Sequence, residues 1–195
     1  MNIIGAGGHA RVIIGIARAA GWSLKGIYDD DRTLAGKDVM GVPVIGVVDE
    51  VPLELAIIAV GDNASRARIA RAYQCDWVTL THPSAFVDPS ARLEAGTVVC
   101  PGAVIQPEAQ IGSHVIVNTS ASVDHECTLA DFSQIGPGAH LGGRVRVGTG
   151  AFIGLGSSVI QGLSIGEWAV VGAGAVVIRP VEANAKVVGN PARPL

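Results

Sequence analysis

The sequence predicts a chain of two parts, a small parallel α/β domain over residues 1–82 and a β-solenoid over residues 83–195. Two patterns carry this prediction. Apolar strands alternate with helical segments in the first part, and a strict six-residue period runs through the second. The composition agrees, because Gly supplies 26 of the 195 residues and aromatic residues only 4%. A core so poor in aromatic side chains has to be built from stacked small aliphatic residues.

The first part shows strands and helices in alternation. The expected elements, in chain order, are a strand at residues 2–4, a helix at 10–20, strands at 24–28 and 55–60, a helix at 64–73 and a strand at 77–80. Asp62 precedes the second helix, where its carboxylate can accept a hydrogen bond from a free backbone N–H. Because alternating strands and helices indicate a parallel sheet, we expect a Rossmann-like domain.

Polar loops follow the expected strands of this domain. The loop Gly5-Ala6-Gly7-Gly8-His9 enters the first helix, and the unpaired N–H groups of such a turn can hold a phosphate. Asp29, Asp30 and Asp31 follow the second strand, where a ribose or base would be bound. GAGGHA also matches the dinucleotide pattern GxGxxA, but about 80 residues are roughly half of a full dinucleotide fold. We therefore expect a mononucleotide or nucleotide-sugar site; a structural turn and a nicotinamide dinucleotide site are the alternatives.

From residue 85 the second part divides into sixteen hexads without an insertion. The third position is always Val, Ile or Leu: Val87, Leu93, Val99, Ile105, Ile111, Val117, Val123, Leu129, Ile135, Leu141, Val147, Ile153, Val159, Ile165, Val171 and Val177. This period fits neither a helix nor a simple alternating strand, but it is typical of a triangular solenoid in which each hexad forms one strand and one corner. Three hexads make a coil, so we expect about five coils with strands about 4.8 Å apart.

Several motifs together resemble one enzyme family: GAGGHARV, YDDD, AVGDN and THPSA in the first part, and NTSASVDHEC and VVGNPAR in the second. With this order of domains, the whole chain resembles the sugar acetyltransferases of the PglD/NeuD type. The resemblance implies a left-handed parallel β-helix and a homotrimer with active sites between subunits. It also implies transfer of acetyl from acetyl-CoA to the 4-amino group of a UDP- or GDP-linked amino-dideoxy sugar. The first domain would bind the nucleotide sugar and the β-helix acetyl-CoA.

The resemblance also assigns residues. It makes His125 the general base and Glu126 the residue that raises its basicity. The positions that match nucleotide-sugar contacts are Gly7, Gly8, His9, Asp29, Asp30 and Gly61, and those that match acetyl-CoA contacts are Leu155 and Ala173. Gln134 stands where close relatives carry a His that touches acetyl-CoA; a Gln amide can donate the same hydrogen bond, but it cannot titrate.

The 18-residue coil predicts which residues are neighbours. Gly143 lies one coil beyond His125. A His can serve as a base at neutral pH because its ordinary pKa is about 6.5, and we expect the backbone N–H of Gly143 to donate to an oxyanion. Asn118 could orient the acetyl group or the amine. Because adjacent strand residues point to opposite faces, Glu126 reaches His125 only at a corner, and Asp124 is the alternative partner.

The same spacing places Gly136, Gly154 and Gly172 in one column. Three corners without side chains would leave a groove for the pantetheine arm of acetyl-CoA; the alternative is that Gly simply suits tight corners. The C-terminal VVGNPAR resembles the CoA-proximal end of other hexapeptide acyltransferases, where Arg193 or Lys186 could meet the nucleotide phosphates of CoA.

Of the remaining histidines only His9 has an expected ligand role, and the thiols carry no expected chemistry. We expect His9 in the ligand loop, His82 in a structural role, and His114 and His140 solvated on outer corners. Cys127 takes the small inward position of its hexad and should be buried and inert.

Other function classes fit less well. A net charge of −3 gives no reason to expect nucleic acid, and no run approaches the ~18 apolar residues of a membrane span. We expect a cytoplasmic protein with reduced thiols. We expect no metal site, because His114, His125 and His140 lack the spacing of a zinc-dependent solenoid enzyme. O-acetylation of a sugar hydroxyl, as in sialic acid, and a non-enzymatic nucleotide-binding scaffold are the alternatives to N-acetyl transfer.

Overall fold

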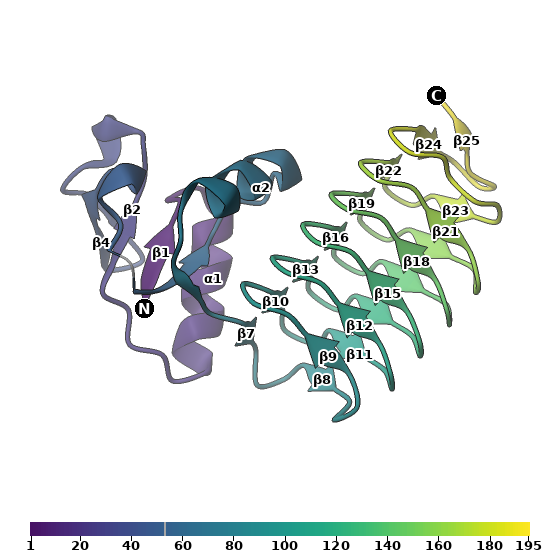
Figure 1. The fold of residues 1–195 in the computed structure, drawn as a ribbon, viewed down its shortest axis with the longest axis horizontal. Coiled ribbons are helices and arrows are strands. Elements are labelled where there is room, and N and C mark those ends of the chain that lie inside the picture. Colours follow the sequence, from purple (N-terminus) through teal and green to yellow (C-terminus); the bar gives the residue numbers. More distant parts are fainter. Residues whose placement is uncertain (53) are drawn as a thin grey trace.

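The computed structural model describes residues 1–52 and 54–195, which form an α/β domain docked against one end of a long β-solenoid (Figure 1). The sheet of the α/β domain has the strand order β3-β4-β2-β1-β5-β6. Its elements are β1 (Asn2–Ile4), α1 (Gly8–Ala19), β2 (Gly26–Tyr28), the 3₁₀ turn Arg32–Leu34, β3 (Asp38–Val39), β4 (Val42–Gly46), the 3₁₀ turn Val48–Glu50, β5 (Leu55–Ile58), α2 (Asn63–Ala72) and β6 (Asp76–Trp77).

The strands at the centre of this sheet are parallel, as the sequence predicts: β1 pairs with both β2 and β5. Asp62 caps α2, since its Oδ1 accepts a hydrogen bond from the Ser65 N–H at 2.7 Å. The antiparallel β3–β4 pair was not predicted. It lies in a stretch where Met40 and Gly41 both have positive φ, and β3, with two residues, is too short to show a period.

The solenoid has three faces, each a ladder of short strands. The first face consists of β7 (Leu80–Thr81), β10 (Val98–Val99), β13 (Ile116–Val117), β16 (Gln134–Ile135), β19 (Phe152–Ile153), β22 (Val170–Val171), β24 (Lys186–Val188) and the antiparallel β25 (Arg193–Pro194). The second consists of β8 (Phe86–Val87), β11 (Val104–Ile105), β14 (Ser122–Val123), β17 (His140–Leu141), β20 (Ser158–Val159) and β23 (Val176–Val177). The third consists of β9 (Arg92–Leu93), β12 (Gln110–Ile111), β15 (Thr128–Leu129), β18 (Arg146–Val147) and β21 (Ser164–Ile165).

The six-residue period explains this architecture. Each expected hexad contributes one strand, from β8 to β23, and each strand pairs in parallel with the strand 18 residues later, as in Val99 with Val117. The aliphatic third positions point inward and, with the small first positions, form one continuous core. The ladder is longer than expected because β7 and β24 extend the first face at its two ends.

The α/β domain packs on the first face, at the start of the solenoid. Ile13 and Ile14 of α1 share a buried cluster with Val98 and Ile116 of that face. The expected strand at residues 77–80 is therefore wrong in one respect. It is divided, because Trp77 pairs within the α/β sheet whereas β7 already pairs with β10 of the solenoid. The domain boundary between residues 82 and 83 stays a prediction.

Within residues 1–52 and 54–195, neither helix has the length and apolar character that a bilayer crossing requires.

Candidate active site

His125 lies at the corner between the second and third faces, which we call the His125 corner. Its Nδ1 is 2.9 Å from Oε2 of Glu126, and its side chain is 46% exposed. Glu126 has a φ of 57°, which turns the backbone so that two adjacent side chains meet. Asp124 instead accepts a hydrogen bond from the His125 backbone N–H at 2.7 Å. Of the two carboxylates left open by the sequence, the one on the imidazole in the structure is therefore Glu126.

Gly143 lies directly beneath the imidazole. A Cβ at Gly143 would stand 2.5 Å from Nε2 of His125, so only Gly leaves room for the ring in this position. The 18-residue length of a coil thus correctly predicts that these two residues are neighbours. Gly143 is buried under the ring, and no acceptor among the described residues takes a hydrogen bond from its N–H. With Nδ1–H donated to Glu126, Nε2 carries the lone pair that a base needs.

The residues predicted to hold the nucleotide sugar gather where β1, β2 and β5 end. A Cβ at Gly7, Gly8 or Gly61 would meet open space, so these backbones lie open to a ligand. Asp29 braces the glycine-rich loop, because its Oδ2 accepts the Ala6 N–H at 2.7 Å.

A cavity of about 370 Å³ lies between the residues that follow β2 and the end of β4, and Asp29 helps to line it. Asp30 accepts the Val48 N–H at 3.1 Å through Oδ1 and so holds the turn after β4 against the end of β2. Asp29 and Asp30 therefore shape the loops at this edge, with Asp29 at the wall of the cavity.

His9 of the glycine-rich loop is partly buried, and its Nε2 has no hydrogen-bond partner. Burial, with a smaller effect of the nearby Arg66 guanidinium, lowers the pKa of His9 to about 4. This imidazole is therefore neutral at physiological pH, and its unpartnered Nε2 is shielded from solvent.

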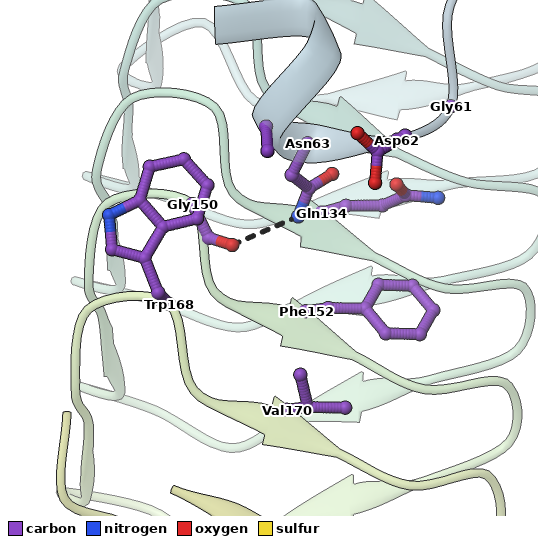
Figure 2. Close-up of a pocket in the computed structure, with 9 residues that line it drawn as sticks. Gly61, Asp62, Asn63, Gln134, Gly150, Phe152, Trp168 and Val170 are labelled. Carbon is purple, nitrogen blue, oxygen red and sulfur yellow. Dashed lines mark hydrogen bonds between the residues drawn. The ribbon is translucent and has the colours of Figure 1, made fainter. Parts of the chain in front are cut away.

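A second cavity, of about 450 Å³, lies between the start of α2 and the first face of the solenoid (Figure 2). It brings together Gly61, from the nucleotide-sugar set, and Gln134, from the acetyl-CoA set. Phe152 lies one coil beyond Gln134 and forms the apolar floor. The indole of Trp168 closes one side and covers Gly150, where a Cβ would lie 2.3 Å from the ring.

The other residues expected to bind acetyl-CoA lie at the corner between the first and second faces, which we call the Leu155 corner. Leu155 is 58% exposed, and Ala173 one coil further is exposed as well. Asn118 lies two coils before Leu155 at the same corner, where its Oδ1 accepts the Thr119 N–H at 2.8 Å. The Leu155 corner and the His125 corner are thus opposite edges of the second face.

The glycine column at the Leu155 corner has a packing reason. A Cβ at Gly136 or Gly154 would approach backbone atoms of the next coil to 2.7 Å or less, and at Gly172 it would meet Val188. The positions form a column as expected, but they lie against the next coil rather than along an open groove. The structure therefore favours the alternative that these glycines suit tight corners.

The structure contradicts the expectation for His114. This residue is only 4% exposed and lies between Trp77 of the α/β domain and Phe132 of the next coil, parallel to the latter at 5.4 Å between ring centroids. The periodic pattern places His114 at an outer corner correctly, but the docked α/β domain covers that corner. Burial lowers its pKa to about 4.

His140 and His82 behave differently from His114. His140 is exposed on β17, where it meets Ser122 at 2.8 Å, rather than at a corner. His82 accepts the Ser84 N–H through Nδ1 and so supports a turn. The three histidines considered for zinc lie at separate places on the solenoid, and no group of three or more His, Cys, Asp or Glu in the described part of the chain could hold a metal ion.

The thiols follow the sequence prediction. Cys127 is fully buried in the solenoid core, and burial raises its pKa, so it is a poor nucleophile. Cys100 is also fully buried, and its pKa is raised to about 12 for the same reason.

The sequence did not indicate the seam between the two domains. Asn63 donates from Nδ2 to the Gly150 carbonyl at 3.1 Å, and the buried Arg66 donates to the carbonyl of His114. The 18-residue length of a coil could have predicted that Gln134 and Phe152 are neighbours. No pattern in the sequence indicates which solenoid corner α2 covers.

Comparisons with known proteins agree with this geometry. A family model described as the PglD N-terminal domain matches residues 1–73. The UDP-N-acetylbacillosamine N-acetyltransferase of Bacillus subtilis is 40% identical over 106 residues, which cover 50% of this chain and 49% of that protein. An uncharacterized protein of Acanthamoeba polyphaga mimivirus is 33% identical over 101 residues, which cover 50% of this chain and 20% of that protein. The matched regions thus span half or less of these curated relatives.

Solved structures match over the whole chain. A variant of the GDP-perosamine N-acetyltransferase of Caulobacter crescentus, in complex with CoA and GDP-perosamine, has 40% identity and a TM-score of 0.92 over 100% of this chain and 95% of its own. The acetyltransferase domain of PglB from Neisseria gonorrhoeae, in complex with acetyl coenzyme A, has 39% identity and a TM-score of 0.93 over 100% and 98%. The chain therefore belongs to the PglD/NeuD-type family of hexapeptide-repeat sugar acetyltransferases.

Proposed function

We propose that this protein transfers acetyl from acetyl-CoA to the 4-amino group of a nucleotide-linked amino-dideoxy sugar. The observation that carries the proposal is the imidazole of His125, held by Glu126 and lying above Gly143. The comparisons support the substrate class, because two related enzymes are named for N-acetylation of UDP- and GDP-linked sugars. Acetyl-CoA takes part as a second substrate, which donates its acetyl group.

The chain's own residues supply the acid–base chemistry. Nε2 of His125 accepts the proton that the sugar amine loses as its nitrogen bonds to the thioester carbon. The Gly143 N–H can donate to the oxygen that gains negative charge in this step. As the carbon–sulfur bond breaks, the protonated His125 returns the proton to the leaving thiolate. Glu126 stabilises the imidazolium between these transfers, because its carboxylate lies 2.9 Å from Nδ1.

The α/β domain holds the nucleotide sugar in this proposal. The open backbones of Gly7, Gly8 and Gly61 would receive its phosphates and sugar, as N–H groups at the start of a helix favour anions. His9 would add a neutral ring nitrogen. The cavity beside Asp29 has room for the nucleoside.

We also propose a homotrimer in which two subunits complete each site. The His125 corner and the Leu155 corner bound opposite edges of the second face, so one chain does not bring the base to the expected acetyl-CoA contacts. The outward residues of the third face are all exposed and polar: Arg92, Gln110, Thr128, Arg146 and Ser164. Those of the second face are largely apolar or small: Phe86, Val104, Ser122, His140, Ser158 and Val176. This contrast favours the second face as the subunit contact.

The test is release of free thiol from acetyl-CoA in the presence of a panel of UDP-, GDP- and dTDP-linked 4-amino sugars, each compared with the matching sugar that lacks the amine. We expect at least one to drive stoichiometric thiol release and to yield an N-acetylated product by mass. Release only with a sugar that lacks the amine would contradict N-transfer and indicate O-acetylation. Nucleotide binding without thiol release would contradict enzyme function and favour a scaffold. A cytoplasmic location stays a prediction.

A further inference from the structure

Arg66 of α2 is a fully buried charge at the seam between the two domains. Its side chain is among the largest fully buried ones, with 1% of its surface exposed, and no described carboxylate forms a salt bridge with it. Burial lowers the pKa of the guanidinium to about 10, so it remains charged at neutral pH. A buried charge without a counter-ion is expensive unless hydrogen bonds satisfy it fully.

On one side, Arg66 binds the solenoid. Its Nε donates to the carbonyl of His114 at 2.8 Å, and its Nη2 donates to the carbonyl of Phe132 at 2.8 Å. His114 and Phe132 lie 18 residues apart, so Arg66 joins two successive coils at one corner. A planar guanidinium can reach both carbonyls because its donors point in fixed and different directions.

On the other side, Arg66 binds the loop that enters its own helix. Nη1 donates to the carbonyls of Val60 and Gly61, each at 3.1 Å, and Nη2 donates to Oδ1 of Asn63 at 2.8 Å. Asn63 in turn donates from Nδ2 to Gly150 on the solenoid. All five N–H groups of Arg66 therefore have acceptors, and they tie the Gly61 loop to the solenoid at the edge of the 450 Å³ cavity.

We propose that Arg66 is a positioning residue that fixes the nucleotide-sugar loop at Gly61 relative to the acetyl-CoA side of the cavity at Gln134. The inference rests on the proposed function. It follows from the arrangement of acceptors: a residue needed only to join the domains has no reason to bind the carbonyl of Gly61 itself. Reacting groups carried by different domains have to be held in register, because a displacement of about 1 Å can lower the rate by about 10²-fold.

The experiment compares Arg66→Lys with Arg68→Lys, a control on the exposed side of the same helix. Lys keeps the charge but has one nitrogen, which cannot bridge both sets of carbonyls. We expect Arg66→Lys to lower kcat/KM for the nucleotide sugar by about tenfold to a hundredfold, mainly through kcat. The Kd for acetyl-CoA should stay within about threefold of the wild type, because the solenoid itself is unchanged. Arg68→Lys should leave all of these constants unchanged.

Circular dichroism and a mass measurement in solution test whether each variant is folded and has the same oligomeric state as the wild type. If Arg66→Lys does not fold, Arg66→Gln replaces it, since a neutral amide avoids burying an incompletely satisfied charge. Folded variants with wild-type constants for the nucleotide sugar would overturn the inference, as would an equal loss of acetyl-CoA affinity or failure of both variants to fold. Wild-type protein that acetylates no nucleotide sugar would instead contradict the proposed function.

Discussion

The solenoid corners that hold His125 and His114 differ in what surrounds the histidine. At the His125 corner the imidazole is about half exposed and binds a carboxylate; at the corner that holds His114 the ring is buried and its Nδ1 has no partner. The backbone turns are alike, because Glu126 and His114 have similar positive φ values of 57° and 55°. The difference arises from the α/β domain, which covers one corner and leaves the other open.

The comparison shows that the repeat determines where a side chain lies. Docking of the α/β domain then determines whether that side chain is buried or open to water and ligands. A covered corner excludes water, so its histidine stays neutral and contributes packing. An open corner leaves its histidine hydrated and free to meet a ligand. Substitutions at the open corner should therefore change turnover, and a substitution at the covered corner should change stability.

The largest effect should come from His125→Ala. We expect kcat to fall by about 10²–10⁴-fold at neutral pH with little change in acetyl-CoA binding, because the variant lacks only the base. The loss should shrink as the pH rises toward the pKa of the sugar amine, since more of the amine is then neutral and depends less on a base for its attack. A steady-state pH series measures this. Near-wild-type turnover at pH 6.5 would show that the enzyme acts by positioning alone.

Gly143→Ala should have the next largest effect. The added methyl would stand 2.5 Å from Nε2 of His125, and the flexible imidazole, rather than the backbone, has to move. We expect about a tenfold to hundredfold loss of kcat with an unchanged Tm. Gly15→Ala on α1 is the control, because a Cβ there meets open space. If kcat is retained, the imidazole does not react from its position above Gly143.

Glu126→Gln should have a smaller and pH-dependent effect. Removing the carboxylate 2.9 Å from Nδ1 makes the imidazolium less stable. The acidic limb of the kcat/KM profile should therefore move to lower pH, with a smaller loss at the plateau than in His125→Ala. If the acidic limb of the kcat/KM profile stays at the wild-type pH, Glu126 does not have this role, and Asp124 becomes the better candidate.

The sequence predicted the solenoid in more detail than the α/β domain. A period of six assigns every strand from β8 to β23 and places Gly143 under His125, because successive coils repeat the same geometry. The β3–β4 pair had no such repeat, and its short strands depend on turns.

The contacts at the seam between the two domains could not be predicted from the sequence, and the reason is physical. Arg66 donates mainly to backbone carbonyls, which every residue possesses, so no side-chain pattern marks its partners. The burial of His114 has the same origin, since it depends on Trp77 from another domain. The glycine column was placed correctly, but backbone collisions with the next coil cannot be read from spacing alone.

The most direct test of the difference between the corners applies one substitution, His→Gln, at each of them and measures both turnover and the pH dependence of stability. Burial lowers the pKa of His114 to about 4, below its ordinary value of about 6.5. The unfolded chain therefore binds this proton first, and stability is lost as the pH falls from about 6.5 to about 4.

We predict that His114→Gln makes the unfolding free energy less dependent on pH in that window, with His9 responsible for part of the remaining slope. Its kcat at pH 7.5 should stay within about threefold of the wild type, because it lies outside the reacting groups. His125→Gln should lose about 10²-fold or more in kcat. Turnover lost in His114→Gln with an unchanged stability slope, or turnover kept in His125→Gln, would contradict the account.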